Sequence, residues 1–89
     1  MVAYRLAIKP AAAKELDRVG QKRDRVRIVA RIQDLASEPR PPGCEKLAGG
    51  VQLYRLRQGQ YRIVYEIDDK VRSADVIKIG HRREVYRDV

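Results

Sequence analysis

Three arginines with a spacing suited to anion binding lie around a single glycine, at positions 55, 57 and 62. The pair Gln58-Gly59 between them predicts a two-residue hairpin turn. Counting outward from that turn places Arg55 opposite Arg62, with Arg57 two residues away. All three then share one sheet face, because side chains alternate between faces along a strand. Like charges opposed across two strands are destabilising, so this pattern predicts a bound anion that offsets the repulsion.

The chemistry of the guanidinium group favours phosphate as that anion. Its planar fork can donate two hydrogen bonds to phosphate oxygens at once. Arg82, just after the next predicted strand, is expected to join the same cluster. The alternative is a set of solvated arginines on an exposed face, which is what a run of charge usually means. The shared face favours the phosphate site.

The tail and the intervening segments supply further candidates. His81 is the only histidine, and only histidine has an unperturbed pKa near neutrality, so it is a candidate for proton transfer. Tyr86 lies in a charged tail, where it could stack on a base or pack back onto the sheet. Lys46, Lys78 and Arg83 are expected to add positive charge for RNA binding.

The composition narrows the class of partner. The chain has 89 residues, with 20 Lys and Arg against 12 Asp and Glu, a formal net charge of +8. This charge favours a polyanion: RNA, DNA or an acidic protein. No segment approaches the roughly 18 apolar residues of a membrane-spanning helix, and the N-terminus lacks the apolar stretch of a signal peptide. We therefore expect one domain over residues 1–89 and no membrane partner.

The single cysteine, Cys44, supports two further predictions. A lone thiol suits a reducing cytoplasm. One cysteine and one histidine cannot supply the four ligands of a structural zinc site, so no such site is expected.

The elements that would position these residues follow from apolar spacing and breakers. A strand is expected at residues 2–8, and Pro10 suits the first turn of a helix reaching Val19. Apolar residues at helical spacing predict a second helix from Lys22 to Ala36. Prolines and Gly43 then predict a loop over residues 37–50.

Period-two patterns predict three strands after that loop, at residues 51–57, 60–67 and 72–79. Tyr54, Leu56, Tyr61, Ile63 and Tyr65 should face the helices, as should Ile77 and Ile79 of the last strand. The order is a strand, two helices and a three-stranded antiparallel meander. The expected fold class is α+β, with both helices on one face of the sheet.

Several runs of residues resemble the RelE toxins of the RelE/ParE superfamily, which belongs to type II toxin–antitoxin systems. The resemblance covers essentially the whole chain, and residues 80–86 are its most specific part. It rests on the runs Lys9-Pro10-Ala11-Ala12, Lys46-Leu47, Tyr54-Arg55-Leu56-Arg57, Tyr61-Arg62-Ile63-Val64-Tyr65 and Ile79-Gly80-His81-Arg82-Arg83-Glu84-Val85-Tyr86.

The resemblance implies the same fold and an endoribonuclease that cleaves mRNA in the ribosomal A site, through attack by a ribose 2′-hydroxyl on the adjacent phosphate. It implies that Arg55 and Arg62 stabilise the charged phosphorane and that Arg57 belongs to the same catalytic set. Arg82 would assist the leaving 5′-oxygen, and Tyr86 would stack on or orient the substrate. It also implies a cognate acidic antitoxin as partner, in the cytoplasm.

The sequence departs from the best-known members, which carry lysines where this chain has Arg55 and Arg57. A lysine with a depressed pKa can act as a base, whereas an arginine in a protein effectively cannot. Either charge stabilisation carries the reaction or another group, such as His81, takes the proton.

Two alternatives share the basic charge. One is a ParE-like toxin of the same fold that inhibits DNA gyrase without nuclease activity. The other is a nucleic-acid-binding module without catalysis. The arginine set with Tyr86 favours the nuclease, because a gyrase inhibitor that acts by binding does not need it.

Overall fold

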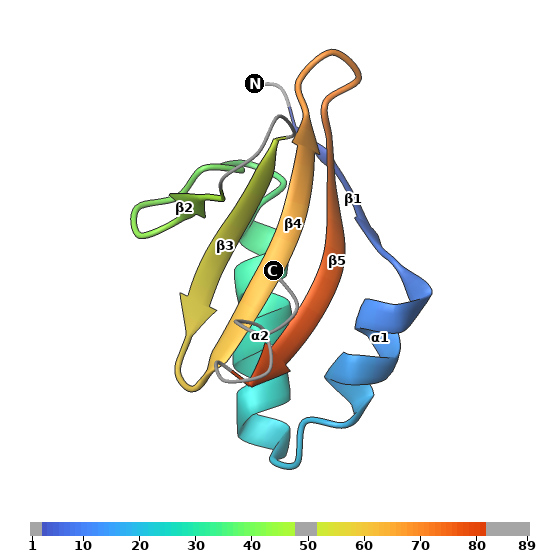
Figure 1. The fold of residues 1–89 in the computed structure, drawn as a ribbon, viewed down its shortest axis with the longest axis vertical. Helices are drawn as coiled ribbons and strands as arrows, with labels where there is room; N and C mark the ends of the chain where they lie inside the picture. The colour runs from blue at the N-terminus through green and yellow to red at the C-terminus, as the bar shows by residue number, and fades with distance from the viewer. Residues whose placement is uncertain (1–2, 48–51, 82–89) are drawn as a thin grey trace.

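The fold is a five-stranded mixed sheet with two helices, in a computed structural model that describes residues 3–47 and 52–81 (Figure 1). The sheet order is β1-β5-β4-β3-β2, and β1 runs parallel to β5 while all other neighbours are antiparallel. In chain order the elements are β1 (Arg5–Ile8), α1 (Pro10–Asp17), α2 (Lys22–Asp34), β2 (Glu45–Lys46), β3 (Leu53–Gln58), β4 (Tyr61–Asp68) and β5 (Ser73–His81).

Both helices contribute to one core on one face of the sheet. Pro10 stands in the first turn of α1, where the ring fixes a helical φ and the missing N–H costs nothing. Ala12 of α1 and Ile28 and Ile32 of α2 are buried in the same apolar cluster as the inward side chains of the sheet. The predicted α+β class and the two helices are confirmed, and each helix ends two residues before the expected position.

Strand alternation places the expected side chains against the helices. Tyr54, Leu56, Ile63 and Tyr65 are buried in the core, and Tyr61 packs against it half-buried. These residues were assigned to this face from the sequence, and that assignment is confirmed. The residues between them, including Arg55, Arg57 and Arg62, therefore lie on the outer face, away from the helices.

The strand β2 lies where the sequence predicted only a loop. Glu45 pairs with Arg55 and Lys46 with Tyr54, so β2 forms the edge of the sheet beside β3. A strand of two residues is too short to show a period-two pattern, so this strand could not be predicted from the sequence.

The turn between β3 and β4 lies one residue later in the chain than the sequence predicted. Gln58 pairs with Tyr61 and Arg57 with Arg62, so the two loop residues are Gly59 and Gln60. Gly59 has φ +60° at the first loop position, which a type II′ turn requires and glycine adopts without strain. The prediction that Arg55 lies opposite Arg62 is therefore wrong, and Arg57 takes that place. The shift leaves every side chain on its expected face.

A β-bulge corrects a second expectation. Val64 pairs with Lys78 and Tyr65 with Val76, so Ile77 is the extra residue on β5. The bulge interrupts the alternation of faces, and Val76 and Ile79 enter the core while Ile77 stays outside it. The prediction that Ile77 faces inward is wrong for this reason. The strand also continues past Gly80 to His81.

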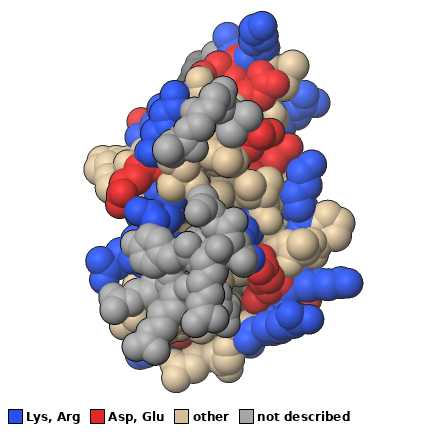
Figure 2. Space-filling model, viewed as in Figure 1, with Lys and Arg blue, Asp and Glu red and all other residues tan. Residues whose placement is uncertain are grey.

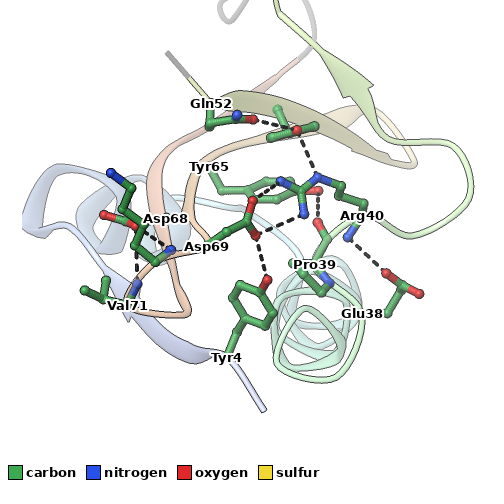
Figure 3. Close-up of polar contacts among 11 residues, drawn as sticks. Tyr4, Glu38, Pro39, Arg40, Gln52, Tyr65, Asp68, Asp69 and Val71 are labelled. Carbon is green, nitrogen blue, oxygen red and sulfur yellow. Dashed lines mark hydrogen bonds and ion pairs between the residues drawn. The ribbon is translucent and has the colours of Figure 1, made fainter. Parts of the chain in front are cut away.

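The loop between α2 and β2 is fastened to the sheet by Arg40 (Figure 3). Its guanidinium donates to both carboxylate oxygens of Asp69, in the turn after β4, at 3.2 and 2.8 Å. Its Nε donates to the Tyr54 hydroxyl at 2.9 Å, and its charge lies 5.1 Å from the centre of that ring. The Tyr4 hydroxyl donates to Asp69 at 2.6 Å. These four residues form what we call the Arg40 clasp.

The clasp changes the titration of its members. Hydrogen bonds from Arg40 and then Tyr4 hold the pKa of the Asp69 carboxyl below its usual range. The same bond to Asp69 raises the pKa of the Tyr4 hydroxyl. Beneath the clasp, burial raises the pKa of Tyr65, whose hydroxyl donates to the Pro39 carbonyl at 2.8 Å. The loop that leads into β2 is thus tied to the sheet by charged and neutral groups together.

None of the helices in the described part of the chain is long and apolar enough to cross a membrane.

Candidate nucleic-acid interface

The centre of the outer sheet face holds two directly opposed arginines. Arg57 of β3 and Arg62 of β4 are register partners, so their side chains leave the sheet on the same side. Arg57 is exposed, whereas Arg62 is only 6% exposed. Arg57 donates from Nε to the Gly59 carbonyl at 3.4 Å, a long hydrogen bond that leaves most of its donor capacity for other partners.

Arg55 lies next to this pair and has an acidic neighbour. Its guanidinium donates to Oε2 of Glu45 at 2.9 Å, across β2 and β3. The Arg55 side chain is 16% exposed, whereas that of Glu45 is 67% exposed. A carboxylate thus stands at the rim of the arginine face and is open to solvent. We call Arg55, Arg57, Arg62 and Glu45 the arginine face.

Figure 2 looks onto the same side of the molecule. Where the described residues are visible in that view, Lys and Arg side chains lie among Asp and Glu side chains. Any specificity of this face for phosphate depends on the register positions of its arginines.

The two predicted RNA-binding lysines leave opposite sides of the sheet. Lys46 is opposite Tyr54, whose ring is in the core, so Lys46 leaves β2 on the helix side of the sheet. Lys78 is opposite Val64, which in turn is opposite Arg55, so Lys78 leaves β5 on the outer face. Its amine forms an ion pair with Glu15 of α1 at 3.1 Å.

His81 also lies away from the arginines. It is opposite Tyr61 at the end of β5, and the two rings meet edge to face with centroids 5.9 Å apart. Tyr61 packs against the core, so this pair belongs to the helix side of the sheet. The other predicted site residues, Arg82, Arg83 and Tyr86, lie outside the described residues.

Glu45 is the member of the arginine face that the sequence did not single out. Its position opposite Arg55 would have identified it as a candidate. This pairing depends on β2, however, and the sequence did not predict that strand. A carboxylate beside guanidinium groups can accept a proton from a substrate, while the guanidinium groups bind and stabilise negative charge. This face can thus bind a phosphate and assist proton transfer next to it.

Comparisons with known proteins agree with this fold. A family model described as the ParE toxin of type II toxin–antitoxin systems matches residues 6–86. Toxin RelE of Mycobacterium tuberculosis is 32% identical over 85 residues, which is 94% of this chain and 87% of that protein. Toxin RelG of the same organism is 35% identical over 57 residues, covering 61% of this chain and 62% of that protein.

Solved structures of RelE toxins are also similar to this chain. The archaeal RelE–RelB complex from Pyrococcus horikoshii OT3 contains a chain with a TM-score of 0.82 and 29% identity, covering 91% of this chain and 97% of that one. A chain of the intact E. coli RelBE toxin–antitoxin complex has a TM-score of 0.74 and 30% identity, covering 89% and 96%. With a family match over nearly its whole length, a mixed five-stranded sheet and two helices on one face, this chain belongs to the RelE/ParE superfamily and is a toxin of the type II toxin–antitoxin class.

Proposed function

We propose that this toxin is a ribosome-dependent endoribonuclease that cleaves mRNA in the ribosomal A site and so inhibits translation. The observation that carries the proposal is the direct opposition of Arg57 and Arg62, with Arg55 on the same face. Opposed like charges are unfavourable in a sheet, and a bound phosphate relieves them. The mycobacterial RelE and RelG toxins and the solved RelE structures support the assignment to this branch of the family.

The proposed reaction is an in-line attack within the RNA itself. The ribose 2′-oxygen forms a bond to the adjacent phosphorus, and the bond from phosphorus to the 5′-oxygen breaks. The products are a 2′,3′-cyclic phosphate and a 5′-hydroxyl end. Arg55, Arg57 and Arg62 stabilise the charge that develops on the phosphorane, and fixed charge of this kind is often the largest contribution to catalysis.

Glu45 is the group that we propose to accept the proton of the 2′-hydroxyl. The guanidinium groups cannot serve as a base, because an arginine in a protein stays protonated. His81 lies with Tyr61 on the helix side of the sheet, away from the arginine face. The Glu45 carboxylate lies 2.9 Å from Arg55 and is well exposed, so it can reach a substrate bound on the arginine face.

The rest of the chemistry is assigned by resemblance to the family. Arg82 would stabilise the leaving 5′-oxygen, which takes its proton from solvent, and Tyr86 would stack on or orient the substrate. Arg83 would add charge for RNA binding. No cofactor is assigned, because positioned charge and one carboxylate account for each step.

We further propose an acidic antitoxin as the cognate partner, in the cytoplasm. The solved relatives from P. horikoshii and E. coli are described as RelE with RelB and as the RelBE toxin–antitoxin complex. A net charge of +8 favours binding of an acidic segment, which can fold as it binds. Such a complex should be markedly more stable than the free toxin.

One observation favours a second candidate function. The matching family model carries the ParE description, and ParE-like toxins inhibit DNA gyrase by binding. That activity does not need an opposed arginine pair with a carboxylate beside it. The arginine face therefore favours the nuclease.

Two assays on the purified protein separate these functions. In the first, the toxin is added to translating ribosomes and the messenger ends are mapped by primer extension. Codon-phased cuts that need ribosomes support the nuclease, whereas cutting of free RNA would overturn the A-site mechanism. In the second, DNA gyrase is assayed for supercoiling. An intact messenger together with blocked supercoiling would establish the second candidate instead.

A further inference from the structure

A cavity on the helix side of the sheet, outside the arginine face, has the lining of a small binding site. Its volume is about 240 Å³, below the roughly 300–1,000 Å³ of pockets that hold drug-sized ligands, which suits a single planar ring system. It lies at the hairpin end of the sheet beside the end of α1. Its lining residues are Glu15, Arg18, Val19, Tyr61, Ile79, Gly80 and His81.

The polar centre of this cavity is the Glu15 carboxylate. One oxygen accepts from the Lys78 amine at 3.1 Å and the other accepts from the Ile79 backbone N–H at 3.0 Å. A carboxylate has about four acceptor sites, so these two bonds fix its orientation and leave capacity for a ligand. Only 26% of the Glu15 side chain is exposed, which strengthens its interaction with a donor.

The remaining lining suits an aromatic ring attached to a phosphate. Tyr61 and His81 present two rings at 76° to each other, and Val19 and Ile79 add buried apolar surface. Arg18 contributes an exposed guanidinium at the rim. Proteins that bind single-stranded RNA stack its bases on aromatic side chains and read the base edges with hydrogen bonds.

We propose that this cavity binds a nucleobase that carries an exocyclic amine, and that Glu15 accepts a hydrogen bond from that amine. Cytosine presents an amine donor at the edge where uracil presents a carbonyl oxygen, and a carboxylate repels the oxygen. The site therefore discriminates against uracil. The source of the base rests on the proposed function, because an RNA substrate would supply it.

The register places the cavity near the arginine face. Gly80 lines the cavity and is the register partner of Arg62, while Tyr61 precedes Arg62 in β4. The arginine face and the cavity thus occupy opposite sides of the same end of the sheet. An RNA strand with one phosphate on Arg57 and Arg62 can place a neighbouring base around that end, so Glu15 would contribute to sequence preference.

The test is a titration of the isolated, nitrogen-15-labelled protein with CMP and UMP, followed by NMR. The two nucleotides carry the same phosphate, so any difference between them reports on the base. CMP should shift the backbone amide signals of Ile79 and Gly80 and bind about tenfold more tightly than UMP. Equal affinities, shifts confined to Arg57 and Arg62, or no saturable shift would each overturn the inference.

A variant pair sharpens the test. Glu15→Gln replaces the carboxylate by a group that both donates and accepts, so the preference for CMP should fall to within about twofold. Glu66→Gln removes the same charge from an exposed position on the outer face and should keep the preference. If Glu15→Gln does not fold, the comparison of CMP with UMP on the wild-type protein still tests the proposed base preference. No ribosome is involved, so failure here leaves the cleavage assay as an independent test of the proposed function.

Discussion

Arg57 and Arg62 lie directly opposite each other across β3 and β4, and both side chains leave the sheet on the face away from the helices. A sheet is more stable when opposed residues carry opposite charges or apolar side chains. Arg55, two residues from Arg57, is balanced by Glu45 at 2.9 Å. The pair at the hairpin end thus brings two guanidinium groups together, an arrangement suited to binding phosphate.

Arg57→Gln should separate stability from activity. Removing one of two opposed charges is expected to raise the free energy of unfolding by up to about 0.5 kcal/mol, because repulsion across the strands is relieved. Messenger cleavage on ribosomes should fall by about 10- to 100-fold, since one phosphate contact is lost. Denaturant unfolding and single-turnover cleavage measure the two quantities. Arg27→Gln, at an exposed position on α2, is the matched control and should change neither. A loss of activity of the same size in both variants would show that net charge alone is responsible.

Glu45→Gln tests the proposed proton acceptor. The amide keeps the shape of the side chain but cannot take up a proton at neutral pH. The cleavage rate should fall by roughly 100-fold or more, which is the range for loss of a general base. The control is Glu66→Gln on the same face, which should keep the wild-type rate. An unchanged cleavage rate in the Glu45 variant would exclude it as the base.

Gly59→Ala should disturb the hairpin that aligns the arginines. Gly59 has φ +60°, where a Cβ costs roughly 1–2 kcal/mol, and an added Cβ meets no atom within 4 Å. The expected loss in unfolding free energy is therefore conformational. Gly20→Ala provides the control, because Gly20 also has open space around it and no positive φ. Equal stabilities of the two variants in denaturant unfolding would show that the turn does not require glycine.

The Arg40 clasp should make the stability of the protein depend on acid pH. Arg40 and Tyr4 lower the pKa of Asp69 in the folded protein, so the clasp contributes fully above the ordinary carboxyl pKa of about 4. This contribution is lost as the pH falls through the lower, folded value. The stability difference between wild type and Asp69→Asn should therefore be constant above about pH 5 and shrink below about pH 4. Unfolding measured by denaturant across this range checks the sign. A difference that grows at low pH would contradict it.

Much of the fold could be predicted from periodicity. Apolar spacing and Pro10 placed both helices, and alternation placed Tyr54, Leu56 and Ile63 on the correct face. Moving the turn by one residue along the chain shifts the partner of each β3 residue by two residues on β4. Because side chains alternate with a period of two, this shift changes the partner of each arginine but keeps its face. That is why Arg55, Arg57 and Arg62 were correctly predicted to share one face, while the partner of Arg62 was predicted wrongly.

Other features depend on tertiary pairing that the sequence pattern does not encode. The bulge at Ile77 becomes visible only when β5 is paired with β4. The same holds for β2 and so for the contact of Glu45 with Arg55. The position of His81 beside Tyr61 follows from β5 extending past Gly80, which the sequence favoured as a strand end.

The most direct test of the central claim uses a messenger with a single 2′-deoxy substitution at the nucleotide whose 2′-oxygen would attack, placed in the A site of programmed ribosomes. The purified toxin should cut the unmodified messenger there and leave a 2′,3′-cyclic phosphate and a 5′-hydroxyl end. It should leave the deoxy messenger intact, because the attacking oxygen is absent. Cleavage of the deoxy messenger at the same position and rate would contradict 2′-hydroxyl attack on the arginine face.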